Sequence, residues 1–309
     1  MRTRPKLMLL LAFLLFAVTA SADSVYVISM NLANGNRQFG TVDLSAGAFQ
    51  QIGPATPDIE YRGLVPASNG SLLTLSFAGN LTSINPATGL PTVIGPTGLS
   101  DCSTPGSPCG PNSAGVLAGL GGTLYATDFS QNLYTVNPAT GAAKLIGATG
   151  IPPVPFVSHF TSNPDGSANV FEATLFAANG KLYATFDTNT LDPATGQITH
   201  ELPNNLYQLD PNTGVGTLVA PTTQTLTAAA EVNGTTYAFD IETQQLLTLD
   251  LANGHTSVVT DVDPVLGYVE GAAPTPEPVS IGLAISGIAA IGVCRLRRHG
   301  QRVTPESTM

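Results

Sequence analysis

The central part of the chain repeats one pattern, a short segment of alternating apolar and polar residues that ends in a turn. In the turn, Asn or Asp can hydrogen-bond its own backbone two residues on, Pro presets φ, and Gly supplies a left-handed residue before the next strand. The pattern therefore predicts a strand, a tight turn and a second strand, repeated along the chain. The clearest copies are residues 81–89, 133–141 and 206–214, and degenerate copies lie at 39–43 and 246–254.

Two further kinds of segment precede the copies of this pattern. One is small and apolar, and the other is rich in residues that favour strands and mostly opens with Gly. Each unit thus contains four short strands joined by turn residues, which is typical of a β-propeller blade. The first strands are predicted at 63–65, 115–117, 173–175 and 228–230, the second at 24–28, 70–75, 122–127, 180–185 and 234–239, and the last at 92–95, 144–147, 217–220 and 257–260.

The spacing of the units predicts the number of blades. The intervals are 42, 52, 73 and 40 residues between the residues that open the turns, Asp43, Asn85, Asn137, Asp210 and Asp250. A four-stranded blade usually takes about 40–50 residues. We therefore predict an all-β fold over residues 23–273, a β-propeller of about five four-stranded blades. A β-sandwich or an open β-solenoid is the alternative architecture.

Two departures from the regular repeat predict further features. The long interval holds extra sequence at 186–205, including another Leu-Asp-Pro-Ala-Thr-Gly run at 191–196, and we expect an added hairpin there. The repeats begin near Ser24 with a segment of the second kind, whereas residues 268–272 resemble a first strand. We therefore expect the last segment to complete the first blade, which would close the ring and remove the open edges.

The N-terminal end has a composition unlike the repeats. Three basic residues precede an apolar run at 7–18, and small residues follow at 19–22. This order predicts a signal peptide over residues 1–22, cleaved before Asp23. An N-terminal membrane anchor is the alternative, for which the apolar run is short.

The C-terminal end, residues 274–309, combines three features in a fixed order. An uncharged, mostly apolar run at 279–294 is near the lower length limit of a membrane-spanning helix, and we predict a single transmembrane helix there. Basic residues after it favour the cytoplasmic side, so the repeats would lie outside. A plain tail anchor or a buried core helix would have a similar pattern. The flanking residues are Pro276, Glu277 and Pro278 before the run and Arg295, Arg297 and Arg298 after it.

This order resembles the PEP-CTERM sorting signal, and the resemblance covers about residues 274–299. It implies recognition by an exosortase-type membrane peptidase, with cleavage near the Pro-Glu-Pro. It also implies a Gram-negative producer and an association with extracellular polysaccharide or the cell surface. The family label describes a sorting route and says nothing about the activity of the domain in front of it.

The charge of the repeat region argues against a nucleic-acid partner. Residues 23–273 hold 19 acidic residues and four basic ones, Arg37, Arg62, Lys144 and Lys181, for a formal charge of −15. Such a surface repels phosphate backbones, and it also keeps an exported protein soluble.

The cysteines predict a local disulfide. Cys102 and Cys109 flank a turn-rich loop, and we expect them to pair in an oxidising compartment. Cys294 lies in the tail. The histidines are scattered and none lies near the cysteine pair, so we expect neither a metal site nor a cofactor.

Carboxylates are the remaining candidates for catalysis, because no Gly-x-Ser-x-Gly motif is present. In a propeller the first strands line the channel, and Arg62, Glu172 and Glu270 precede the small residues of those strands. Two acids facing each other across a channel could act as a glycosidase pair, so Glu172 and Glu270 are catalytic candidates. Solvated channel acids are the alternative interpretation. The chain has no Trp and eight Tyr, so aromatic platforms for sugars are scarce.

Two functional hypotheses follow. The first is an exported, non-catalytic cell-surface or extracellular-matrix protein, whose processing partners are signal peptidase and the exosortase-type peptidase. Residues 279–294 would hold it in the inner membrane, with the domain on the periplasmic side, until processing releases it to the cell surface. The alternative is an extracellular glycan-active enzyme or lectin that uses the channel carboxylates.

Overall fold

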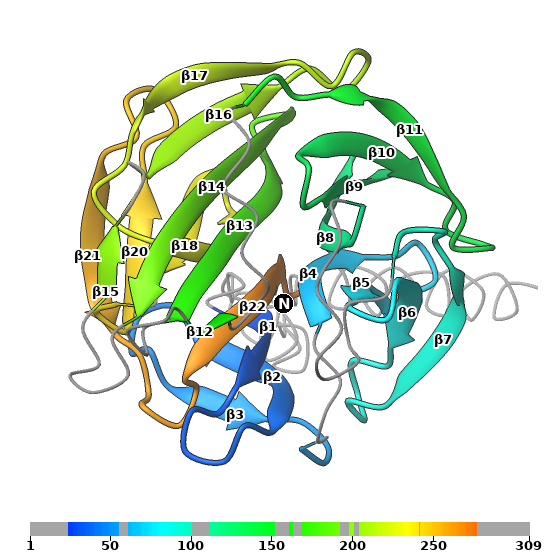
Figure 1. Cartoon of the computed structure of the whole chain (residues 1–309). Helices are drawn as coiled ribbons and strands as arrows, with labels where there is room; N and C mark the ends of the chain where they lie inside the picture. Colours follow the sequence, from blue (N-terminus) through cyan, green and yellow to red (C-terminus); the bar gives the residue numbers. More distant parts are fainter. Residues whose placement is uncertain are drawn as a thin grey trace, which may run out of the picture. The chain divides into compact units, whose positions relative to one another are not determined.

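Alternating apolar residues and turns rich in glycine produce short antiparallel strands and no helix among the described residues (Figure 1). The computed structural model describes residues 24–55, 61–100, 112–151, 161–162, 168–191, 198–200, 204–240 and 242–276. At 161–162, 168–172, 187–191 and 198–200 the backbone alone is described. Within these ranges, no helix has the length and apolar character that crossing a bilayer requires.

The strands form five antiparallel sheets. Blade 1 contains β22 (Tyr268–Pro274), β1 (Ser24–Met30), β2 (Arg37–Asp43) and β3 (Phe49–Gln51). Blade 2 contains β4 (Tyr61–Pro66), β5 (Leu72–Ser76), β6 (Asn80–Ile84) and β7 (Pro91–Pro96). Blade 3 contains β8 (Ala114–Leu120), β9 (Thr123–Asp128), β10 (Asn132–Val136) and β11 (Ala143–Ala148). Blade 4 is built on β13 (Ala168–Ala178), β14 (Lys181–Leu191), β16 (Asn205–Leu209) and β17 (Gly216–Pro221). Blade 5 contains β18 (Leu226–Val232), β19 (Thr235–Asp240), β20 (Gln245–Leu249) and β21 (Thr256–Asp261).

The inner strands of the blades close into a ring. β4, β8, β13, β18 and β22 contact one another in this order, and β22 contacts β4 again (Figure 1). The protein is therefore a five-bladed propeller, which confirms the predicted all-β fold, the four-stranded blades and their number.

Blade 1 is completed by the two ends of the repeat region. β22 pairs with β1 in antiparallel register, from Val25 opposite Pro274 to Met30 opposite Tyr268. The register shifts between Ile28 and Ser29. Ile28 lies opposite Gly271 and Ser29 lies opposite Val269, so Glu270 has no residue opposite it and forms a β-bulge. The predicted closure of the ring by the last segment is confirmed.

Blade 4 carries the predicted insertion. β14 continues past the blade and pairs with β15 (Ile198–His200), with Asn189 opposite His200. A further short strand, β12 (Thr161–Ser162), pairs with β13 on the other side. The added hairpin is therefore confirmed, and its connection at 192–197 lies outside the described residues.

Among the described residues, the hydrophobic core has five large clusters, each between two neighbouring blades, and a sixth formed by Phe77 packed against Phe129. Successive side chains of an inner strand point to opposite faces of the sheet and so reach different neighbours. In β8, for example, Val116 and Ala118 pack against blade 4, whereas Ala114 and Leu117 pack against blade 2. The other large clusters join blades 4 and 5, 5 and 1, and 1 and 2. Each blade is therefore buried only through its neighbours.

The turns of the repeated pattern also join the blades. Each turn glycine lies against the end of the outer strand of the preceding blade. Hydrogen bonds span three of these joints: Ala143 N to Thr97 O (2.9 Å), Gly216 N to Thr149 O (2.7 Å) and Asp263 N to Gly47 O (3.0 Å). The repeated glycine thus serves both the turn and the packing between blades. The pairs are Gly47 with Asp261, Gly89 with Ile52, Gly141 with Gly95, Gly214 with Gly147, and Gly254 with Pro221.

Several predicted features lie outside the described residues. They are the signal peptide at 1–22, the cysteines Cys102 and Cys109, the motif residues Glu277 and Pro278, the apolar run at 279–294, and the arginines Arg295, Arg297 and Arg298.

Candidate functional site at the propeller channel

The five inner strands surround a cavity of about 170 Å³. It is narrow because glycines let the strands approach closely. A Cβ atom on Gly63 would lie 2.1 Å from the carbonyl oxygen of Leu117. Ligand pockets usually have volumes of about 300–1,000 Å³, so this cavity is small for an organic ligand. Its walls are mostly glycine, alanine and aliphatic residues, and the polar residues that line it are Thr174, Thr227, Glu231 and Glu270.

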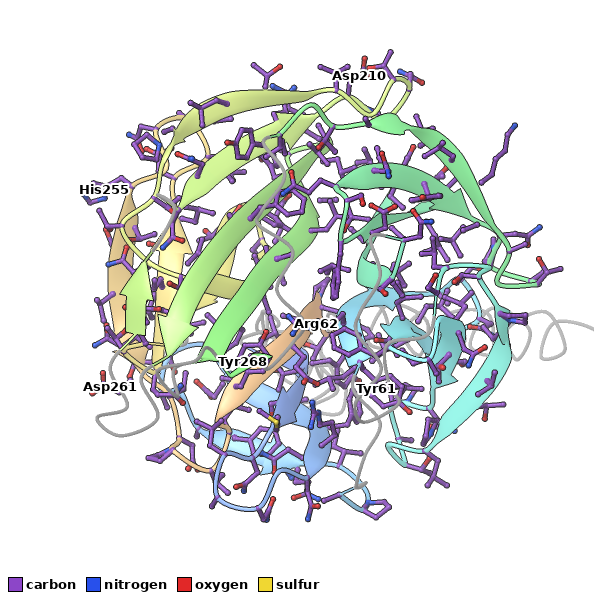
Figure 2. The ribbon with its side chains drawn as sticks, in the orientation of Figure 1. Tyr61, Arg62, Asp210, His255, Asp261 and Tyr268 are labelled. Carbon is purple, nitrogen blue, oxygen red and sulfur yellow. The ribbon has the colours of Figure 1, made fainter. Side chains whose placement is uncertain are left out.

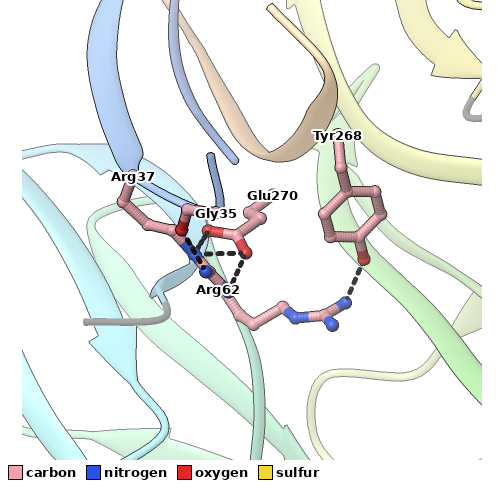
Figure 3. A network of polar contacts seen from close by, with 5 residues as sticks. All are labelled: Gly35, Arg37, Arg62, Tyr268 and Glu270. Carbon is pink, nitrogen blue, oxygen red and sulfur yellow. Dashed lines mark hydrogen bonds and ion pairs between the residues drawn. The ribbon is translucent and has the colours of Figure 1, made fainter. Parts of the chain in front are cut away.

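Glu270 forms a buried ion pair beside this cavity (Figure 3). Arg37, the first residue of β2, donates from Nε to both carboxylate oxygens, at 3.0 and 3.3 Å, and its Nη2 lies 3.0 Å from Oε1. The Glu270 side chain is fully buried and that of Arg37 is 12 % exposed. Arg37 also donates to the carbonyl oxygen of Gly35 at 3.2 Å. Its contacts hold the Glu270 carboxylate toward β2.

Arg62 occupies a second buried position, on the inner strand of blade 2. Its Nη1 donates to the Tyr268 hydroxyl at 2.5 Å, and its guanidinium carbon lies 5.2 Å from the ring centre of Phe77 and 5.3 Å from that of Tyr268. This is the range of cation–π attraction. Phe77 in turn meets Phe129 of blade 3 edge-on, with ring centres 6.0 Å apart. Burial raises the pKa of the neighbouring Tyr61 to about 12, which keeps its phenol neutral.

Half of the rare basic residues of the domain lie largely buried near the inner strands. Arg37 and Arg62 are two of the four basic residues between positions 23 and 273. Figure 2 places Arg62 and Tyr268 near the centre of the ring of blades, whereas Asp210 and His255 lie toward its circumference. Arg62 connects blades 2 and 1 through its contact with Tyr268. The contacts of Arg37 with Gly35 and Glu270 lie within blade 1 and join its strands.

The structure places one of the two predicted catalytic acids. Glu270 lies beside the channel as expected, but Arg37 contacts both of its carboxylate oxygens. The backbone of Glu172 lies in β13, where it pairs with Asp187 of β14, and its side chain lies outside the described part of the chain. The described geometry gives Glu270 a structural partner and does not place the two carboxylates opposite each other.

Metal coordination has no assembled ligand set in the described ranges. No group of three or more His, Cys, Asp or Glu side chains there is arranged to hold an ion. His255 is exposed on blade 5. Asp261 accepts from Gln245 on the neighbouring strand β20 at 2.9 Å, and Asp263 accepts from the backbone of Val265 in its own turn at 3.0 Å.

Sequence reasoning identified Arg62 and Glu270 as channel residues and missed Arg37 and Phe77. Arg37 lies 233 positions from its partner Glu270, and the pattern of its segment indicates only the polar beginning of a strand. The available signal was its rarity, because a basic residue that is rare in an acidic domain is a candidate for a specific ion pair. Phe77 follows a predicted strand and carries no local sign of its contact with Arg62.

Comparisons with known proteins give similarities of fold alone. No family model and no curated protein matches the chain. A chain of a nidogen/laminin complex is 13 % identical with a TM-score of 0.46, over 81 % of this chain and 97 % of that one. The PQQ-bound aldose sugar dehydrogenase of Streptomyces coelicolor is 13 % identical with a TM-score of 0.40, over 70 % and 85 %. A protein of unknown function from Bacteroides thetaiotaomicron VPI-5482 is 16 % identical with a TM-score of 0.46, over 84 % and 66 %. At these values the similarities carry no inference about ligand or partner.

Proposed function

We propose that this chain is an exported, non-catalytic propeller of the cell surface or extracellular matrix, sorted through its C-terminal tail by an exosortase-type peptidase. The order of the tail carries the proposal: Pro276-Glu277-Pro278, an apolar run at 279–294, then a cluster of arginines. Each part has a physical role in sorting. The run has about the length needed to enter a bilayer, and the arginines favour the cytoplasmic side.

The proposed route has two processing steps. Signal peptidase removes residues 1–22 after export, and residues 279–294 hold the protein in the inner membrane with the propeller on the periplasmic side. The exosortase-type peptidase then cuts near the Pro-Glu-Pro and releases the propeller to the cell surface. Cys102 and Cys109 form a disulfide in the oxidising compartment. The partner class at the surface is extracellular polysaccharide.

The properties of the channel support a non-catalytic role. Its cavity of about 170 Å³ is smaller than usual ligand pockets, and Arg37 contacts both carboxylate oxygens of Glu270. The alternative of a glycan-active enzyme or lectin needs Glu172 and Glu270 as free carboxylates that face one another. No described contact favours that arrangement.

The intact mass of the mature protein, recovered from its own producer, tests the proposal. We expect a chain that starts at Asp23 and ends near the Pro-Glu-Pro. A mass that retains every residue through Met309 would mean a plain membrane anchor and would overturn the sorting proposal. Turnover of a polysaccharide by the purified domain would overturn its non-catalytic part.

A set of arginine variants adds a matched control. Replacing Arg295, Arg297 and Arg298 together by Gln removes the positive cluster next to the apolar run, and we expect the unprocessed chain to accumulate. Arg302→Gln removes a positive charge outside the cluster, and we expect normal processing. Equal processing of the two variants would contradict a role for the cluster.

A further inference from the structure

The inner strand of blade 1, β22, contacts strands of three blades. It pairs with β1, and it also contacts β18 of blade 5 and β4 of blade 2. Its residues before the exposed Pro274 are almost entirely inaccessible, with exposed fractions of 4 % for Tyr268, 3 % for Val269, 1 % for Glu270, 7 % for Ala272 and 1 % for Ala273. Removing β22 would therefore expose two interfaces between blades and one edge of β1.

The β-bulge at Glu270 sets which side chains of β22 face which blade. Val269 and Ala272 both belong to the core cluster between blades 5 and 1, whereas Ala273 belongs to the cluster between blades 1 and 2. In a regular strand, residues three apart point to opposite faces. Val269 and Ala272 share a face because the bulge inserts one extra residue between them.

The ion pair of Glu270 holds this bulge in place. Arg37 lies on β2, which is separated from β22 by β1, so its side chain reaches past an entire strand to the carboxylate. Removing one member of a buried pair leaves an uncompensated charge, which strongly destabilises the segment that carries it. The pair therefore adds a buried electrostatic contact to the β1 pairing and the packing against β18 and β4 that hold β22 in blade 1.

The closing strand is also where the repeat region ends. Pro274, its last residue, lies opposite Val25, near the beginning of β1. Pro276, the first residue of the Pro-Glu-Pro motif, follows Pro274 by two positions in the chain. A peptidase needs an extended, accessible segment, and residues 268–273, which are buried in the ring, meet that requirement only when β22 leaves it.

We propose that β22 is a closing strand, held by the Glu270–Arg37 pair, which sets the limit of C-terminal processing at Pro274. The inference rests on the proposed processing of the tail and adds a structural rule to it. Proteolysis from the C-terminus stops at the ring while the Glu270–Arg37 pair is intact, and opening of the ring exposes β22 to further proteolysis. The propeller is thus released as a closed ring or is degraded from its C-terminus.

Digestion of the purified full chain, in detergent, by a carboxypeptidase that also removes proline tests this rule. The mass of the product is followed over time. For the wild type we expect digestion to stop with Thr275 or Pro274 as the last residue. For Arg37→Gln we expect digestion to continue through β22, at a rate roughly a hundredfold above that of the wild type. Lys181→Gln makes the same charge change at a side chain bonded to Gln208 on the exposed surface, and it should stop where the wild type stops.

Further arms of the experiment separate the alternatives. Glu270→Gln serves as a second variant if Arg37→Gln does not fold, because Gln keeps the shape of the side chain and removes only its charge. We expect its digestion also to continue through β22. Denatured wild type carries the same prolines and controls for the sequence preference of the carboxypeptidase. The proposal is overturned if the wild type loses β22 as fast as the variants do, or if the variants stop at Pro274.

The mature protein from its producer distinguishes this inference from the function on which it rests. A mature chain that ends before Pro274 would overturn the limit set by β22 and leave tail processing intact. A chain that retains Met309 would overturn tail processing, and the carboxypeptidase result would still decide whether β22 limits digestion.

Discussion

At the scale of single residues, glycine decides how closely neighbouring blades approach one another. Gly141 has a φ of +82°, and a Cβ atom there would lie 2.4 Å from the carbonyl oxygen of Gly95 in the preceding blade. Gly70 has nearly the same φ, +83°, but nothing lies within 4 Å of its Cβ position. The two positions share a backbone conformation and differ in their surroundings.

We predict that alanine at these two glycines has different costs. Gly70→Ala should cost about 1–2 kcal/mol, because only the left-handed conformation is penalised. Gly141→Ala adds a clash with backbone and should cost about 2–5 kcal/mol. Urea unfolding of both variants measures the difference, and equal losses would mean that the contact with Gly95 is not limiting.

A second residue-scale effect concerns the turn that follows β2. The Ser45 hydroxyl, and after it the backbone N–H groups of Ala46 and Ser45, hold the pKa of Asp43 below its ordinary value of 3.8. A lowered folded-state pKa stabilises the protein above the ordinary value, and this contribution is lost as the pH falls through the folded-state value.

We therefore predict a pH-dependent difference between the wild type and Asp43→Asn. The amide can accept the same hydrogen bonds but does not ionise in this range, so the advantage of the wild type should shrink between pH 6 and pH 2. Unfolding free energies of both proteins at several pH values give the difference directly. A constant difference across this range would show that ionisation of Asp43 contributes nothing.

At the scale of elements, each strand has a fixed place between the channel and the rim, and this place determines what its side chains contribute. Leu133 on β10 is fully buried in the cluster between blades 3 and 4. Leu145 lies on the neighbouring outer strand β11 and is 56 % exposed. The same residue type thus has two environments on adjacent strands.

We predict that Leu133→Ala destabilises the protein by about 2–5 kcal/mol, because it leaves a cavity between two blades. Leu145→Ala should change the unfolding free energy by less than about 0.5 kcal/mol. Denaturant midpoints of both variants, at unchanged m-values, test the prediction. Similar losses would contradict the assignment of the core to the interfaces between blades.

At the scale of the whole molecule, stability depends on closing the ring. Every blade buries its apolar faces against two neighbours, and β22 supplies the inner wall of blade 1. A chain that lacks β22 would leave the apolar faces of blades 5 and 2 without their partner.

We predict that truncation after residue 266, which removes β22, abolishes cooperative unfolding. Truncation after Pro276 removes the tail and keeps every strand of the ring, so it should unfold cooperatively like the full chain. Near-UV circular dichroism during urea unfolding distinguishes the two. A cooperative transition in the shorter protein would show that four complete blades suffice.

Much of the fold was predictable because its signals are local. A strand and turn of the form Leu-Tyr-Thr-Val-Asn-Pro-Ala-Thr-Gly carry their own alternation and turn chemistry, so the strand positions, the blade number and the added hairpin of blade 4 follow from nearby residues. Closure by residues 268–272 followed from the requirement that a propeller leave no open inner edge.

The contacts of the candidate site depend on residues far apart in the chain. The sequence alone predicted that Arg62 and Glu270 lie at first strands of a propeller, and that Arg37 is one of four basic residues in an acidic domain. Only the tertiary structure decided that Arg37 meets Glu270 across 233 positions, and that Glu270 lies in a bulge. The physical reason is that local alternation specifies strands and turns, whereas a buried charge is satisfied by whichever partner the closed ring brings within hydrogen-bond distance.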